Sequence, residues 1–223
     1  MPTGKGRVVE LILRDGIRFA RLECPSNLIP TAGQYVLASS DSHDPLPVPL
    51  FYTESAPRGF VAAPAPDSLM PGRELDLRGP LGHGFRLPPS ARKVALVAFD
   101  DSPARLRGLI QSAMKSGAAI VLLCETDVDD LPDEVEIQRL SALPEIIEWA
   151  DYLALDVSRE NLPGLKERLG TMKQARTIEE AEILVRTPIP CGGMAECGVC
   201  AVILRIGWKL TCKDGPVFDL NEV

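Results

Sequence analysis

Four of the six cysteines lie near the C-terminal end of the chain, in the pattern Cys191-x5-Cys197-x2-Cys200-x11-Cys212. Three of these thiols share one loop, and the fourth follows after a predicted hairpin. The loop reads Cys-Gly-Gly-Met-Ala-Glu-Cys-Gly-Val-Cys. Its glycines can adopt positive φ angles without steric cost, so the backbone can curl its N–H groups around bound sulfur. The pattern therefore predicts that these four cysteines are the ligands of a metal centre.

The spacing favours a [2Fe–2S] cluster over other sulfur chemistry. Plant-type ferredoxins use a Cys-x4-Cys-x2-Cys loop with a distant fourth cysteine, and the present loop has one residue more. A structural zinc site with four thiolates remains the alternative, because Cys-x2-Cys is also a zinc spacing. Zinc ribbons usually offer two such pairs, whereas this loop offers one. Disulfides are not expected in a chain without an export signal.

The remaining cysteines and both histidines carry no recognisable site. Cys24 and Cys124 stand alone in apolar segments, where a free cysteine packs as a small hydrophobic side chain. His43 and His83 have no neighbouring pattern of a catalytic triad or a metal site. Trp208 lies between the last two predicted ligands, and we expect it to pack over the centre, with a partner contact as the alternative.

Composition narrows the class of protein. The chain has 223 residues, of which 45% are hydrophobic and 25% charged, and its formal net charge is −7. These values are typical of a globular chain. The acidic balance argues against nucleic-acid binding, which needs a basic face. No apolar run reaches the roughly 18 residues of a membrane span, and the N-terminal residues lack the apolar core of a secretory signal. We therefore expect a cytoplasmic protein.

The first 88 residues predict a six-stranded antiparallel β-barrel, because short β-branched or alternating segments are separated by Gly, Pro, Ser and Asp. Residues 89–186 predict an α/β domain with a doubly wound parallel sheet, because continuous apolar strands alternate there with helical periodicity. Residues 187–223 form a third, cysteine-bearing module. The predicted strands are 7–13, 17–24, 35–38, 49–53, 59–63 and 74–78 in the barrel, then 93–99, 118–124, 135–138, 152–156 and 181–185.

Two segments resemble a known family. The cysteine loop with the tail Gly207–Phe218 is similar to the end of the electron-transfer subunit of dihydroorotate dehydrogenase type B, in the ferredoxin–NAD(P) reductase superfamily. The segment Gly79–Phe85, Gly-Pro-Leu-Gly-His-Gly-Phe, resembles the family's connection between barrel and nucleotide domain. The resemblance implies that Cys191, Cys197, Cys200 and Cys212 are cluster ligands and that the chain acts in a protein complex.

Two family motifs are changed in this sequence. Family members hold FAD with an Arg-Pro-x-Ser motif and a Gly-x-Gly-Thr turn. The equivalent stretches here are 46–53, which retains only a proline, and 63–68, where two prolines lack N–H groups. The turn after the first parallel strand, usually glycine-rich for pyrophosphate, contains Asp100 and Asp101. We expect these two carboxylates to cap the following helix, and Asp156 to be a solvated strand end. The sequence thus predicts that FAD is not held through the family's contacts and that NAD(P) is not bound.

These observations predict an electron-transfer subunit in which a [2Fe–2S] cluster relays single electrons between a redox partner and a larger oxidoreductase. Two alternatives remain open. The chain could be an FAD-containing, NAD(P)H-oxidising reductase subunit that uses other contacts. It could also be a non-catalytic interaction protein with a structural zinc site.

Overall fold

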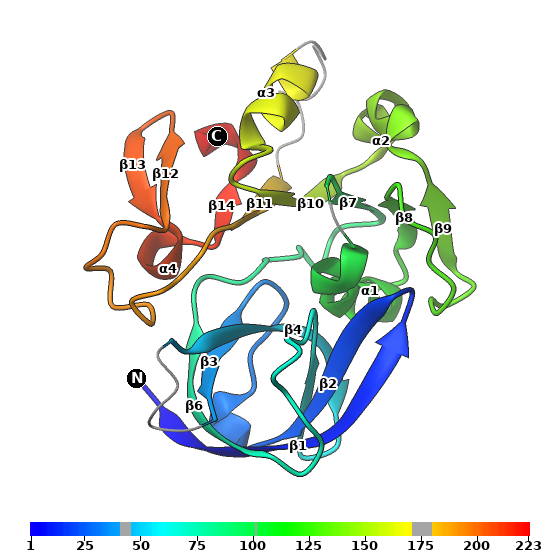
Figure 1. Ribbon diagram of the computed structural model, residues 1–223. Coiled ribbons are helices and arrows are strands. Elements are labelled where there is room, and N and C mark those ends of the chain that lie inside the picture. The colour runs from blue at the N-terminus through cyan, green and yellow to red at the C-terminus, as the bar shows by residue number, and fades with distance from the viewer. Residues whose placement is uncertain (41–45, 101, 171–179) are drawn as a thin grey trace.

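Six antiparallel strands close into a barrel over the first 81 residues (Figure 1). Their order around the barrel is β1-β2-β5-β4-β3-β6. The predicted barrel is confirmed, and its interior is filled by alternating apolar side chains such as Val8, Leu22, Leu50 and Phe60. This computed structural model describes residues 1–40, 46–100, 102–170 and 180–223. The strands are β1 (Thr3–Arg14), β2 (Ile17–Glu23), β3 (Tyr35–Ser39), β4 (Val48–Ala56), β5 (Gly59–Ala62) and β6 (Glu74–Leu81).

The barrel depends on a close backbone approach at Gly59. A Cβ atom at this position would lie 1.8 Å from the carbonyl oxygen of Leu22 on the neighbouring strand. We therefore expect Gly59→Ala to reduce the free energy of unfolding by about 1–3 kcal/mol or more, as overpacking does. Urea unfolding followed by circular dichroism measures the effect. Gly164→Ala is the matched control, since that helical glycine has open space around it and alanine there should stabilise by up to about 1 kcal/mol.

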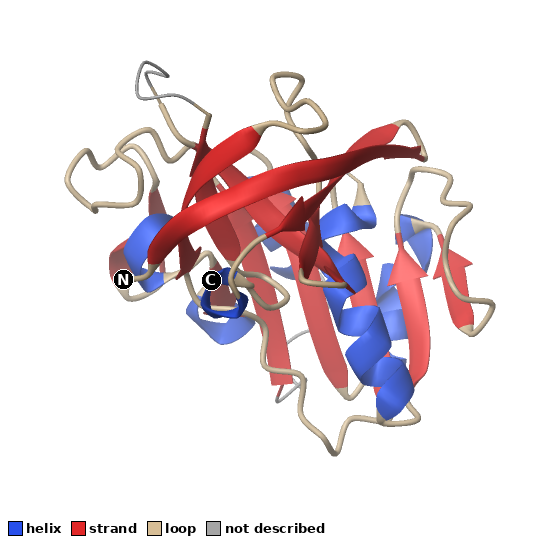
Figure 2. Cartoon of the chain, turned by 90° about the horizontal axis from the view of Figure 1, so that it is seen from below, coloured by secondary structure: helices blue, strands red, loops and turns tan. Residues whose placement is uncertain are grey.

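The second domain is a doubly wound sheet with the strand order β14-β11-β10-β7-β8-β9 (Figure 1). All neighbouring pairs are parallel except β11 with β14. Residues of α1 pack on one face of the sheet, and residues of α2 and α3 pack on the other. Figure 2 shows these helices beside the strands. The elements are β7 (Lys93–Ala98), α1 (Arg107–Lys115), β8 (Ala119–Leu123), β9 (Val135–Gln138), α2 (Leu143–Trp149), β10 (Tyr152–Ser158), α3 (Leu162–Gly170) and β11 (Glu180–Arg186).

The predicted α/β domain is thus confirmed. The strands β7, β8 and β10 are buried on both faces, which explains their continuous apolar sequences, whereas β9 at the edge is largely exposed. No helix in the described ranges is long and apolar enough to cross a membrane.

The C-terminal segment forms a hairpin and then returns to the α/β sheet. The hairpin pairs β12 (Ala201–Leu204) with β13 (Gly207–Leu210), and α4 (Thr211–Asp214) follows it. The last strand, β14 (Val217–Asp219), then lies antiparallel to β11, and Phe218 joins the core of the second domain. The end of the predicted cysteine module is therefore part of the neighbouring sheet.

Ion pairs join the two large domains on the side of α1. The buried Arg107 at the start of α1 contacts Glu54 of the barrel at 3.1 Å, and Arg14 contacts the same carboxylate at 2.9 Å. Both guanidinium groups lie over the ring of Phe19. These contacts hold the barrel at a fixed position against the α/β domain.

Candidate metal centre

The structure brings the four predicted cysteines together as two pairs of thiols. The Sγ atoms of Cys200 and Cys212 lie 3.3 Å apart, and both side chains are buried. The side chain of Cys197 lies close enough to that of Cys191 to lower its pKa. Cys191 is half-buried and Cys197 is exposed, and the charge of Cys191 also acts on Cys212. One pair is therefore buried within the protein, and the other lies nearer to solvent.

The cysteine loop wraps its amides around these sulfur atoms. Gly192, Gly193 and Gly198 adopt φ angles of 64°, 72° and 69°, and Ala195 also has a positive φ of 62°. This curled backbone is a nest, a turn in which successive N–H groups point toward one anionic site. The amides of Met194, Glu196 and Cys197 bond to the sulfur of Cys191, and the amide of Ala195 bonds to that of Cys212.

The sulfur environment favours thiolate at one end of the loop. Burial raises the pKa of Cys191, but the Cys197 thiol and the loop amides outweigh it and lower that pKa to about 6. Burial, reinforced by the adjacent Cys200, raises the pKa of Cys212 to about 12. Because thiolates are the form that binds metal, the loop is prepared to bind a cation at Cys191. A positive centre would deprotonate the buried pair as well.

Apolar side chains of the barrel pack against the buried cysteine pair, Cys200 and Cys212. Tyr35 and Leu37 of β3 and Leu81 of β6 pack with Cys200 and Cys212 in one apolar cluster. The connection that follows β6 also contacts the tail. The amide of His83 donates to the carbonyl of Gly215 at 2.7 Å, and a Cβ on Gly82 would lie 2.4 Å from Pro216. The two segments that carry the family resemblance therefore meet in space.

The thiols do not converge on one point. Within the described part of the chain, no group of three or more His, Cys, Asp and Glu side chains is placed to hold a single metal ion. The two-pair arrangement instead suits a centre with two metal ions, each of which takes two thiolates. The residues present therefore fit a [2Fe–2S] cluster.

Aromatic and cationic side chains cover the stretch equivalent to the family's flavin motif. In β4, the ring of Phe51 lies 5.3 Å from that of Tyr35, and the guanidinium of Arg105 lies 5.7 Å from the Phe51 ring. A bulky ring thus stands where the family has a short polar residue. These side chains offer flavin phosphate no hydroxyl contact of the family's kind.

A buried ion network fills the switch point of the α/β sheet, between β7 and β10. Asp156 of β10 is 1% exposed, and it pairs with Arg105 at 3.2 Å and with Arg186 at 2.8 Å. Asp100 also pairs with Arg186 and accepts hydrogen bonds from Ser158. Ligands of open α/β sheets bind at such switch points. Here the chain's own carboxylates occupy that position.

The network corrects two predictions. Asp156 is a buried ion-pair residue and not a solvated strand end. Asp100 does not cap the helix. The cap is Ser102, whose hydroxyl accepts a hydrogen bond from the amide of Ala104. Burial alone would raise the pKa of Asp100, but hydrogen bonds from Ser158 and Asn161 outweigh it and lower that pKa. Asp101 lies outside the described residues.

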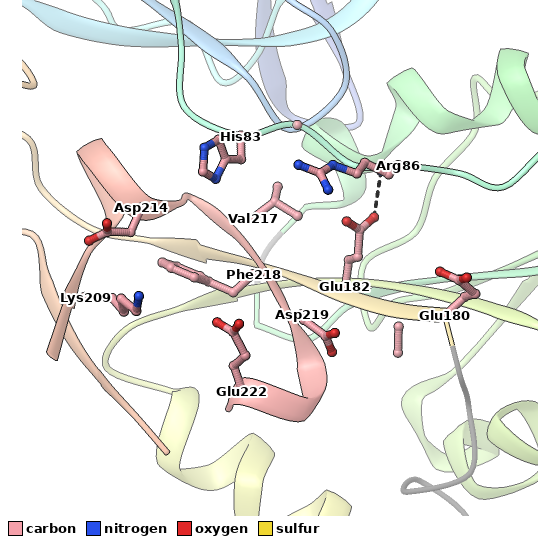
Figure 3. Close-up of a pocket in the computed structure, with 12 residues that line it drawn as sticks. His83, Arg86, Glu180, Glu182, Lys209, Asp214, Val217, Phe218, Asp219 and Glu222 are labelled. Carbon is pink, nitrogen blue, oxygen red and sulfur yellow. Dashed lines mark hydrogen bonds between the residues drawn. The ribbon is translucent and has the colours of Figure 1, made fainter. Parts of the chain in front are cut away.

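A separate cavity of about 510 Å³ lies between the cysteine hairpin and the edge strand β14 (Figure 3). Its walls are mostly charged and include His83, Lys209, Asp214 and Glu222. Glu182, also in this wall, accepts hydrogen bonds from the Arg86 amide and the Tyr152 hydroxyl, both at 2.7 Å. None of the four thiols lines this cavity.

The other sequence predictions had mixed outcomes. Cys124 is fully buried in the core, as predicted, and Cys24 packs half-buried against the barrel core. The expectation that Trp208 packs over the centre is wrong. Its side chain is 71% exposed, because it pairs across the hairpin with Ile203 on the outward face. His43 lies outside the described residues.

Comparison with known proteins finds a relative of this chain. No family model matches the chain. The dihydroorotate dehydrogenase B (NAD(+)) electron transfer subunit of Clostridium perfringens (strain 13 / Type A) is 26% identical over 172 residues, which span 70% of this chain and 68% of the relative. This similarity supports the predicted resemblance to the electron-transfer subunits of dihydroorotate dehydrogenase B.

Solved structures share the fold of this family. The structure of the NADH-dependent reduced ferredoxin-NADP oxidoreductase has a TM-score of 0.72 at 17% identity, covering 98% of this chain and 89% of that one. The ferredoxin reductase of carbazole 1,9a-dioxygenase, in its FAD apo form, has a TM-score of 0.60 at 17% identity and covers 81% and 67%. These neighbours include a reductase described in its FAD apo form, so the comparisons do not support the expectation that FAD binding is doubtful.

Proposed function

We propose that this chain is an electron-transfer subunit that relays single electrons through a [2Fe–2S] cluster held by Cys191, Cys197, Cys200 and Cys212. The donor and acceptor are a redox partner and a larger oxidoreductase. The relative from Clostridium perfringens is named as such a subunit, which supports this role. The single observation that carries the proposal is the arrangement of the four thiols as two neighbouring pairs.

The pairing favours two irons over one zinc ion. In a four-cysteine [2Fe–2S] cluster each iron takes two thiolates, as the two pairs supply here. A single tetrahedral zinc would need all four sulfur atoms around one point. The amides of the loop point at Cys191 and Cys212, and they would offset the negative charge of a cluster.

The chain's residues divide the tasks of an electron relay. The cluster, when bound, would accept and release one electron at a time. Cys200 and Cys212, packed on Tyr35 and Leu81, hold the inner side away from water. Cys197 and Met194 are exposed on the outer side, Met194 by 56%, so a partner protein can approach within a short distance of the thiols there.

A flavin-containing, NAD(P)H-oxidising subunit is the second candidate. The fold favours this candidate. The NADH-dependent reduced ferredoxin-NADP oxidoreductase, a protein of flavin-based electron bifurcation, matches 98% of this chain in structure. The Asp100–Arg186–Asp156–Arg105 network argues against nicotinamide binding at the switch point. Phe51 on β4 argues only against the family's contacts to FAD, so flavin content has to be measured.

The composition of the purified protein tests the proposal. After anaerobic expression and purification, we expect two irons and two acid-labile sulfides per chain, together with a visible spectrum that bleaches on reduction with dithionite. Zinc without iron would contradict the relay. Stoichiometric FAD, with bleaching by NADH or NADPH alone, would support the second candidate instead.

A further inference from the structure

Two buried donor atoms beside the cysteine loop have no hydrogen-bond partner in the described part of the chain. They are the hydroxyl of Tyr35 on β3 and Nη2 of Arg78 on β6. Both atoms are shielded from solvent, so water does not satisfy them either. Leaving a buried donor unpaired costs about 1–3 kcal/mol, and more for a charged group. A fold that keeps two such atoms beside the same segment indicates an acceptor that the polypeptide itself does not supply.

Both donors lie against the predicted cluster ligands. A Cβ atom built on Gly192 would lie 3.3 Å from Nη2 of Arg78, and one on Gly193 would lie 3.7 Å from it. The two glycines thus leave the loop beside Cys191 open to this guanidinium. Tyr35 packs in the same apolar cluster as Cys200 and Cys212. The donors therefore flank the two thiol pairs, Arg78 at the outer pair and Tyr35 at the inner pair.

Both groups are hydrogen-bond donors at neutral pH, because a tyrosine hydroxyl carries its proton and a guanidinium stays charged. Arg78 lines a cavity with Cys191 and Met194, but Nη2 itself points away from solvent. The thiols do not bond to either donor, so a centre held by these sulfur atoms is the acceptor that lies beside both of them.

We propose that Tyr35 and Arg78 donate hydrogen bonds to the sulfur atoms of the [2Fe–2S] centre and thereby raise its reduction potential; this inference rests on the proposed function. A reduced centre carries one more negative charge than an oxidised one. Hydrogen bonds to its sulfur atoms and a nearby cation stabilise that charge. The barrel would therefore set the potential of a centre whose ligands all come from the C-terminal segment. Tyr35 and Arg78 are positioning residues in this scheme.

Redox titration of the full chain tests the inference. The variants are Tyr35→Phe, which removes only the hydroxyl, and Arg78→Gln. Arg78→Lys keeps the positive charge but removes the planar guanidinium group, so it separates the effect of charge from that of hydrogen-bond geometry. Midpoint potentials are measured by electron paramagnetic resonance during anaerobic titration. We expect the equilibrium constant for reduction to fall about tenfold or more in Arg78→Gln, which is about 59 mV for one electron. Tyr35→Phe should shift the potential in the same direction.

The matched controls make the same two substitutions, Tyr to Phe and Arg to Gln, at positions away from the cysteines. Tyr52→Phe removes a hydroxyl that bonds to Ser55, and Arg58→Gln removes an exposed guanidinium that pairs with Glu23. Neither should move the potential. An unchanged potential in a loaded Tyr35→Phe or Arg78→Gln would overturn the role of that residue. Loss of iron from Tyr35→Phe with the fold intact would support the contact. Absence of iron from the wild-type protein would refute the proposed function itself.

Discussion

Replacing Cys212 with serine is expected to abolish the visible spectrum of the protein and to remove nearly all of its iron. Eleven residues separate Cys212 from Cys200, the nearest of the other predicted ligands in the chain, but the Sγ atoms of these two cysteines lie 3.3 Å apart. A serine oxygen at this buried position binds iron poorly compared with thiolate. The measurement is iron and sulfide content per chain after anaerobic purification, with circular dichroism to check that the fold is retained.

Cys24 and Cys124 provide controls of the same chemistry. Cys124 is buried in the core beside β8, and Cys24 packs at the end of β2. Cys24→Ser and Cys124→Ser should retain full iron content, although burial of a hydroxyl in place of Cys124 will lower stability. A Cys212→Ser variant that keeps its iron and spectrum would contradict the proposed ligand set.

Replacing Asp156 with asparagine is expected to lower the free energy of unfolding by about 3–5 kcal/mol, the cost of removing one partner from a buried ion pair. Asp156 is 1% exposed and is the shared partner of Arg105 and Arg186. Asparagine keeps the shape but leaves two guanidinium groups without this counter-charge in a low-dielectric site. Urea unfolding under anaerobic conditions measures the change.

Asp127→Asn is the matched control for this prediction. Asp127 pairs with Arg139 at 2.6 Å, but its side chain is 87% exposed. Pairs of that kind contribute at most about 1 kcal/mol, so the control should unfold almost as the wild type does. Equal stability of the two variants would mean that the network at the switch point is not a structural element of the sheet.

The sequence predicts most of the architecture because local signals are strong there. Alternation and turn residues mark the barrel strands, and continuous apolar runs mark β7, β8 and β10. The last strand, β14, escapes such reasoning because three residues of Val-Phe-Asp carry no period. It forms only because the edge of β11 is available, and that edge is a property of the folded sheet.

The site is predictable where its residues lie close together in the chain and not where they are brought together by folding. The spacing of the cysteines in the loop is enough to predict a metal site. Asp156 looks like a strand end because Arg105 lies 51 residues before it and Arg186 lies 30 residues after it. Tyr35 and Arg78 give no signal at all, since each reads as an ordinary barrel residue. Trp208 is exposed because the register of the β12–β13 hairpin places it on the outward face, and the sequence alone does not determine that register.

The return of the chain to the sheet has a consequence for the proposed electron relay. The segment between β11 and β14 is tethered at both ends, because these strands are neighbours in one sheet and Phe218 is anchored in its core. Such a segment cannot swing between distant docking positions as a carrier on a flexible linker would. Donor and acceptor must therefore come to it, and the length of each electron jump is set by how closely each partner docks.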